Sequence, residues 1–144
     1  MNDQYIATVS VTINANPARI WHALTDAAEV KKYMFDTEIE TDWQKGSAIT
    51  YSGIWKGKEY KDKGTIIEII PGEKLHTTHY SPLSGKPDVP ENYVNVIYTL
   101  EPGTNTDTTV VTITQDKIES LDSLEHMKTN WQMILDGLKN VVEK

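Results

Sequence analysis

The strongest constraint on the fold is a change in the spacing of apolar residues towards the C-terminus. Upstream, apolar and polar residues alternate in short runs, which is typical of strands buried on one face. From residue 122 onwards, apolar residues instead recur every three or four positions, as Leu124, Met127, Trp131, Ile134, Leu138 and Val141. This spacing predicts a helix about 30 Å long, enough to cross a whole sheet.

Two features of the predicted helix indicate how it begins and how it packs. Asp122 is followed three residues later by Glu125, a pair typical of a capping box, so we expect the helix to begin there. Gly137 lies in the middle of the helix, where glycine costs about 1 kcal/mol relative to alanine. We therefore expect the helix backbone to approach a neighbouring element closely at Gly137.

The N-terminal part of the chain predicts one strand and then two short helices. The apolar residues of the strand share one parity: Tyr5, Ala7, Val9, Val11 and Ile13. Asn16 and Pro17 supply a capping residue and a first-turn proline, which predicts a helix over residues 17–25. Asp26 is suited to cap a second short helical turn. Helices this short need a larger element to pack on.

Residues 35–115 predict six further strands, separated by turn residues. The first would direct Thr37, Ile39, Thr41 and Trp43 inward and the acidic residues between them outward. Carboxylates on one face of a strand lie about 7 Å apart, too far to converge on one ion, so we interpret the acidic row as a solvated edge. Residues 81–91 form the longest irregular connection, the kind of segment where binding sites often open.

Composition narrows the possible functions. The 144 residues suit one domain, and the absence of cysteine excludes disulfides and thiolate metal sites. A net charge of −7 disfavours nucleic-acid binding, and the lysines between residues 56 and 63 alternate with Glu59 and Asp62, which is typical of a solvated hairpin. Because there is neither a membrane-spanning apolar run nor a secretory signal, we expect a cytoplasmic protein.

No motif in the chain indicates a committed active site, so we assign no catalytic residue, metal site or cofactor. His76 and His79 are three residues apart on a predicted strand and should point to opposite faces, with His79 inward and His76, like His22, facing water. Glu68 interrupts an apolar run. It is a candidate acid if it points inward, but the outward orientation is favoured.

Four segments in order give the chain a resemblance to a known family. They are PARIWHALTD at 17–26, GTIIEIIP at 64–71 followed by Leu75, TVVTIT at 109–114, and WQMILDGL at 131–138. With them, the chain resembles the Activator of Hsp90 ATPase homologue 1-like group of the START/Bet v 1-like superfamily. The resemblance covers nearly the whole chain, residues 1–144, as a single domain.

The resemblance implies an α+β helix-grip fold. A seven-stranded antiparallel sheet would curve around the long C-terminal helix, with a hydrophobic cavity between them and two short helices between the first and second strands. Members of the superfamily bind lipids, hormones, polyketides or flavonoid-like molecules there, and a few catalyse cyclisation or dehydration. The Hsp90 activator itself carries an additional N-terminal chaperone-binding domain. Because residues 1–144 contain no counterpart, we do not expect a chaperone partner.

The leading hypothesis is a monomeric small-molecule-binding protein whose ligand is apolar and contains rings or resembles a lipid. The candidate ligand-binding residues are the inward apolar, aromatic and histidine side chains of the strands and helix: Ile49, Tyr51, Trp55, His79, Tyr98, Met127, Trp131 and Ile134. A filled core would use the same apolar positions. Two other functions stay open: a cyclase or hydratase using Glu68 or His79 in the cavity, and a stress-related protein-interaction module.

Overall fold

The computed structural model describes residues 5–55, 57–82, 85–105 and 107–143. The seven strands in these ranges are β1 (Tyr5–Ile13), β2 (Glu38–Glu40), β3 (Ala48–Trp55), β4 (Lys58–Ile70), β5 (Lys74–His79), β6 (Val94–Pro102) and β7 (Thr109–Ile118). The α-helices are α1 (Pro17–Leu24), α2 (Ala27–Tyr33) and α3 (Leu121–Glu143), and η2 (Pro90–Asn92) is a short 3-10 helix. The predicted α+β class and element order are confirmed.

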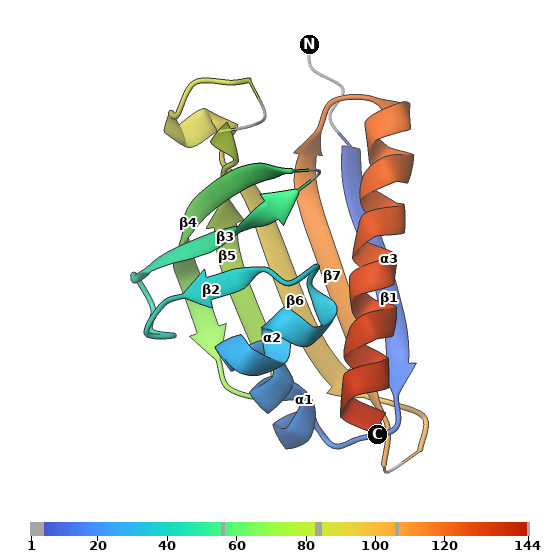
Figure 1. Ribbon diagram of the computed structural model, residues 1–144. Coiled ribbons are helices and arrows are strands. Elements are labelled where there is room, and N and C mark those ends of the chain that lie inside the picture. Colours follow the sequence, from blue (N-terminus) through green and yellow to red (C-terminus); the bar gives the residue numbers. More distant parts are fainter. Residues whose placement is uncertain (1–4, 56, 83–84, 106, 144) are drawn as a thin grey trace.

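The strands form one antiparallel sheet in the order β1-β7-β6-β5-β4-β3-β2, so the first strand pairs with the last. Figure 1 shows the sheet curving around α3, with α1 and α2 filling the space near the C-terminal end of that helix. Figure 1 shows the β3–β4 hairpin pointing towards the other end of α3, and the segment before β6 beyond the same end of the sheet. No helix within the described ranges is long and apolar enough to cross a membrane.

Side-chain caps start both short helices as predicted. The Asn16 side chain accepts a hydrogen bond from the backbone N–H of Arg19 at 2.9 Å, and Pro17 occupies the first turn of α1. The Asp26 side chain accepts from the N–H groups of Ala28 and Glu29, which begins α2. The two helices therefore form where the sequence provides caps, and they pack on α3.

The start of α3 differs from the capping box expected at Asp122. Ser120 Oγ accepts a hydrogen bond from the N–H of Ser123 at 3.1 Å, and the helix begins at Leu121. Asp122 instead lies in the exposed first turn, where its negative charge faces the positive end of the helix dipole. A Ser cap satisfies the same backbone donors as an Asp cap, and these two candidates lie only two residues apart.

The buried face of α3 is also broader than the predicted stripe. Its buried residues are Ile134, Leu135, Leu138 and Val142, so Leu135, which lies off the predicted stripe, is fully enclosed. The C-terminal half of α3 contacts β1 on one side and α1 and α2 on the other, so it needs a wider apolar surface. In the N-terminal half, Leu124, Met127 and Trp131 are only half-buried.

The second strand is shorter than predicted. Thr37 and Ile39 are buried and alternate with exposed acidic residues, as expected, but pairing with β3 covers only Glu38–Glu40. Asp36 and Trp43, on either side, have positive φ angles of 60° and 58°, which interrupt an extended strand. β2 is an edge strand in this sheet, and short edge strands are a common protection against unwanted pairing.

Candidate functional site: a pocket between the sheet and α3

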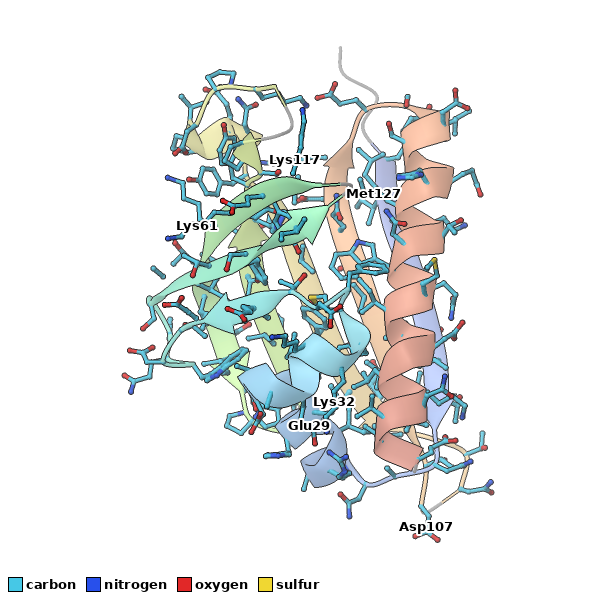
Figure 2. The ribbon with its side chains drawn as sticks, viewed as in Figure 1. Glu29, Lys32, Lys61, Asp107, Lys117 and Met127 are labelled. Atoms are coloured by element: carbon cyan, nitrogen blue, oxygen red, sulfur yellow. The ribbon has the colours of Figure 1, made fainter. Side chains whose placement is uncertain are left out.

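A pocket of about 790 Å³ lies between the concave face of the sheet and the N-terminal half of α3. Its walls come from elements far apart in the sequence: the end of α2, β3 to β7, and α3. Met127 and Lys117, both of which line it, lie near the same end of the molecule in Figure 2. Its volume is within the range of about 300–1,000 Å³ found for small-molecule sites.

Five of the eight predicted binding residues line this pocket: Tyr51, His79, Tyr98, Met127 and Trp131. Two others lie in the filled core, where Ile49 is 1% and Ile134 is 7% exposed. The remaining one, Trp55, has its backbone in β3, but its side chain lies outside the described part of the chain. The interior is therefore filled beside the C-terminal half of α3 and open beside its N-terminal half.

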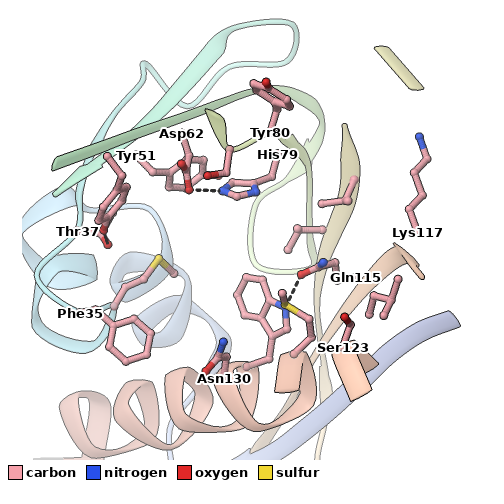
Figure 3. Close-up of a pocket in the computed structure, with 18 of the residues that line it drawn as sticks. Phe35, Thr37, Tyr51, Asp62, His79, Tyr80, Gln115, Lys117, Ser123 and Asn130 are labelled. Carbon is pink, nitrogen blue, oxygen red and sulfur yellow. Dashed lines mark hydrogen bonds and ion pairs between the residues drawn. The ribbon is translucent and has the colours of Figure 1, made fainter. Parts of the chain in front are cut away.

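The polar centre of the pocket is formed by two strands. His79 Nε2 of β5 lies 2.9 Å from Asp62 Oδ2 of β4, as Figure 3 shows, and the Tyr51 ring meets the His79 ring edge-on with centroids 5.3 Å apart. The other carboxylate oxygen, Asp62 Oδ1, is buried and has no hydrogen-bond partner among the described residues. The centre thus places a paired carboxylate and imidazole in the wall of a largely apolar cavity.

A glycine allows the two strands to meet this closely. A Cβ atom added to Gly64 would lie 1.7 Å from the backbone oxygen of Thr78, so only glycine fits at this position of β4. Beside this contact, the backbones of Lys63 and Tyr80 exchange hydrogen bonds of 3.0 and 2.7 Å. The close approach lies next to His79 on β5 and two residues from Asp62 on β4, whose side chains are within hydrogen-bonding distance of each other.

Sequence reasoning missed Asp62, which it placed on a solvated hairpin. This interpretation is wrong for Asp62, since its side chain is only 15% exposed and lines the pocket. The signal was present in the parity of β4, because Asp62 is an even number of residues from the buried Gly64 and Ile66. The neighbouring lysines hid it: Lys61 and Lys63 have the opposite parity and are exposed.

The opposite wall carries an ordered aromatic pair. Trp131 of α3 donates its indole N–H to Gln115 Oε1 of β7 at 2.8 Å, and its ring stands perpendicular to that of Tyr98, with centroids 6.2 Å apart. Figure 3 shows Gln115 and the helix residues Ser123 and Asn130 on the side of the pocket away from His79. The hydrogen bond holds the indole in one orientation, so a fixed ring surface faces the cavity.

Burial keeps the pocket tyrosines protonated at neutral pH. It raises the pKa of Tyr51 to about 12, an effect that the nearby Asp62 carboxylate reinforces and the neighbouring Thr77 side chain opposes. Burial likewise raises the pKa of Tyr98 well above its usual value, with smaller contributions from Tyr51 and Tyr33. Both hydroxyls are therefore neutral groups that donate and accept hydrogen bonds.

The mouth of the pocket combines exposed apolar side chains with polar contacts from the segment before β6. Phe35, Ile54 and Met133 are 46%, 68% and 52% exposed and all line the pocket. Tyr80 donates its hydroxyl to the backbone oxygen of Lys86 at 2.5 Å, and Lys86 forms an ion pair with Glu119, just after β7. The predicted long connection therefore lies beside the cavity.

The other titratable candidates lie elsewhere. Glu68 points away from the pocket, is 43% exposed, and pairs with Lys74 at 2.8 Å, which lowers the pKa of its carboxyl, so the favoured outward orientation is confirmed. His22 is exposed, as expected. His76 also lies outside the pocket, but it is half-buried and hydrogen-bonded to Asn95 at 2.9 Å. In the described ranges, no group of three or more His, Asp or Glu side chains is arranged to hold a metal ion.

Comparison with known proteins places this architecture in a family. Residues 14–143 match the family described as Activator of Hsp90 ATPase homolog 1-like protein. The chain belongs to this family. The solution structure of ChR145 from Cytophaga hutchinsonii is 42% identical to this Hsp90-activator-like chain, with a TM-score of 0.83 and coverage of 96% of this chain and 94% of the relative. The resemblance seen in the sequence is thus confirmed.

More distant structures show the same fold. The Aha1 dimer from Colwellia psychrerythraea is 22% identical, with a TM-score of 0.74 and coverage of 96% of both chains. CalU16 from Micromonospora echinospora is 18% identical, with a TM-score of 0.70 and coverage of 99% of this chain and 86% of that one. No curated protein matches this member of the Hsp90-activator-like family.

Proposed function

We propose that this protein binds a mainly apolar, ring-containing small molecule between its sheet and the N-terminal half of α3. The observation that carries the proposal is the pocket itself, about 790 Å³ in volume, with Tyr51, Tyr98 and Trp131 in its walls. A core of this fold could have been filled by larger side chains at the same positions. Instead, aromatic faces and the soft thioether of Met127 surround an open volume.

The distribution of polar groups supports a ligand that is bound in one orientation. Asp62 and His79 lie together on one wall, while Gln115 holds Trp131 on the other. A few polar groups that converge in an otherwise apolar pocket are typical of small-molecule sites, where they determine the orientation of the ligand. We expect micromolar affinity, about −8 kcal/mol, which a drug-sized ligand readily supplies.

An NMR titration against a panel of apolar ring compounds tests the proposal. We expect the indole N–H signal of Trp131 to shift together with the amide signals of residues 81–91. Trp21 of α1 packs against the core without lining the pocket, so its indole signal is an internal control and should stay in place. Shifts confined to exposed residues such as Lys58 and Glu143, with unchanged tryptophan fluorescence, would show that no ligand enters.

A second candidate function, an acid–base enzyme of the cyclase or hydratase type, is favoured by one observation. His79 faces the pocket and is paired with a carboxylate, the arrangement that orients a histidine for proton transfer. Exchange of the α-protons of a ring ketone, 2-tetralone, into deuterated solvent tests this function. If His79 is a base, His79→Gln abolishes the protein-dependent exchange and His76→Gln, on the opposite face of β5, retains it.

The oligomeric state of this chain stays a prediction. One relative of the same fold was solved as a dimer, whereas we infer a monomer here. The exposed Phe35, Ile54 and Met133 surround the mouth of the pocket, so a dimer formed through them would close the entrance. Light scattering coupled to size exclusion, with and without a bound ring compound, measures the state directly.

A further inference from the structure

One acceptor in the pocket is left without a protein partner. Asp62 uses Oδ2 to hold His79 Nε2 at 2.9 Å, but its Oδ1 is buried and receives no hydrogen bond from the described residues. Buried polar atoms in folded proteins are almost always hydrogen-bonded, and those that are not need an explanation. Oδ1 has almost no accessible surface in this conformation, but Asp62 lines the cavity, so a small rotation of its carboxylate would bring this oxygen to a donor on a bound molecule.

We propose that Asp62 Oδ1 accepts a hydrogen bond from a hydroxyl group of the ligand, so that the pocket selects neutral, hydroxylated aromatic compounds and rejects their carboxylate analogues. This inference rests on the proposed function and specifies its ligand class. The hydroxyl would lie at the Asp62 end of the cavity. The attached ring would extend towards Trp131 on the opposite wall, where it is hydrogen-bonded to Gln115. Figure 3 shows Gln115 away from Asp62 in the pocket.

His79 strengthens the preference for a donor. A carboxylate oxygen only accepts hydrogen bonds, so His79 Nε2 must carry the proton that it shares with Asp62. In the neutral imidazole, Nδ1 is then an acceptor as well. Figure 3 shows this second nitrogen on the side of the ring away from Asp62. The polar centre therefore offers two acceptors to a ligand.

The charges around the pocket argue against an anionic ligand. A ligand carboxylate beside Asp62 would place two negative charges in a cavity where water screens them poorly. The cations among the lining residues already have partners, since Lys86 pairs with Glu119 and Lys117 donates to the backbone oxygens of Glu91 and Tyr93 at 3.3 and 2.9 Å. A neutral His79 N–H leaves the negative charge of Asp62 in place, so anions are the ligands that this wall of the pocket disfavours.

Three fused-ring probes that differ in one group test this inference: 2-naphthol, naphthalene and 2-naphthoate. Their dissociation constants are measured by NMR titration with the wild-type protein, Asp62→Leu and Glu68→Leu. Glu68 is a matched control, since it is a carboxylate of the same strand that points outward to Lys74. We expect the wild-type protein and Glu68→Leu to bind 2-naphthol at least tenfold more tightly than the other two probes, and Asp62→Leu to lose that preference.

The outcomes separate this inference from the proposed function. Equal wild-type affinity for the three probes overturns the hydroxyl anchor and leaves a ring-binding pocket, whereas failure to bind any of them overturns both. A tenfold preference retained in Asp62→Leu shows that the hydroxyl binds elsewhere and also overturns the anchor. If Asp62→Leu does not fold, as judged by its amide spectrum, the comparison of the three probes on the wild-type protein decides whether the pocket selects the hydroxyl group.

Discussion

Gly137 of α3 packs against Tyr33 of α2 so closely that a Cβ atom at position 137 would lie 3.0 Å from the Tyr33 Cβ. Tyr33 cannot easily move away, because its buried hydroxyl donates to the backbone oxygen of Ala23 at 2.8 Å. The contact joins all three α-helices at the filled end of the molecule. It confirms the close approach predicted from a glycine in mid-helix.

Replacing Gly137 by alanine should therefore destabilise the protein. Alanine gains about 1 kcal/mol of helix propensity, but overpacking a tight contact typically costs about 1–3 kcal/mol, so we expect a net loss of about 1 kcal/mol in the free energy of unfolding. Urea unfolding measures this free energy. Asn140→Ala, at an exposed position of the same helix, is the control and should gain a few tenths of a kcal/mol in stability. A Gly137→Ala variant more stable than the wild-type protein would show that Tyr33 shifts to accommodate the added methyl group.

Burial along α3 gives a second prediction. Leu135 is 0% exposed although it lies off the apolar stripe, whereas Leu124 lies on the stripe but is half-buried. We expect Leu135→Ala to cost about 2–5 kcal/mol of unfolding free energy, as truncations in a packed core do, and Leu124→Ala to cost less than half as much. Thermal and urea unfolding of the two variants check this. The reverse order would contradict the observed orientation of the helix.

These residues show why periodicity predicted the fold but not its details. Alternation along the strands and the three-and-four spacing of the terminal helix report which face of each element is buried, and that was enough for the element order. The arrangement of the seven strands in one sheet around the helix was implied by the family resemblance. Periodicity does not report how many neighbours an element has. Leu135 is buried because α1 and α2 cover a second side of α3, which is a property of the tertiary structure.

The site was predictable to the same extent. Parity directed Tyr51 and His79 inward, and both line the pocket. It did not distinguish Ile49, which lies in the filled core, from Tyr51 two residues further along the same strand. Whether an inward residue meets protein or open space depends on which side chains oppose it. Asp62 was missed because a charged residue between exposed lysines is usually solvated, although the parity of β4 directs it inward, where it pairs with His79.

Alkaline stability should depend on Tyr51. Burial raises the pKa of this hydroxyl from 10.0 to about 12, so the folded state holds the proton more tightly than the unfolded chain. The raised pKa therefore contributes to the free energy of unfolding below pH 10, and this contribution is lost as the pH rises to about 12. A shift of this size corresponds to about 3 kcal/mol. Between pH 9 and pH 12, the unfolding free energy of the wild-type protein should fall by about that much more than that of Tyr51→Phe. Equal losses of unfolding free energy in the two proteins would contradict the raised pKa of Tyr51.

The last prediction concerns how a ligand enters. The ion pair between Lys86 and Glu119 links the segment before β6 to the connection between β7 and α3, and both residues line the pocket. Both side chains are exposed, so the pair should contribute less than about 1 kcal/mol to stability. It lies at the entrance, however, and must separate if a ligand passes between these two segments.

Glu119→Gln should therefore change ligand exchange without changing affinity. We expect the association and dissociation rate constants of 2-naphthol, measured by stopped-flow fluorescence, to rise together about threefold, because the variant weakens a barrier that entry and exit share. Glu38→Gln, which breaks the exposed Lys31–Glu38 pair away from the pocket, is the matched control and should leave both rates unchanged. Unchanged rates in Glu119→Gln would show that the ligand does not pass between these two segments and enters on the Phe35 and Ile54 side of the mouth. A change in the dissociation constant would instead mean that Glu119 contacts the bound ligand.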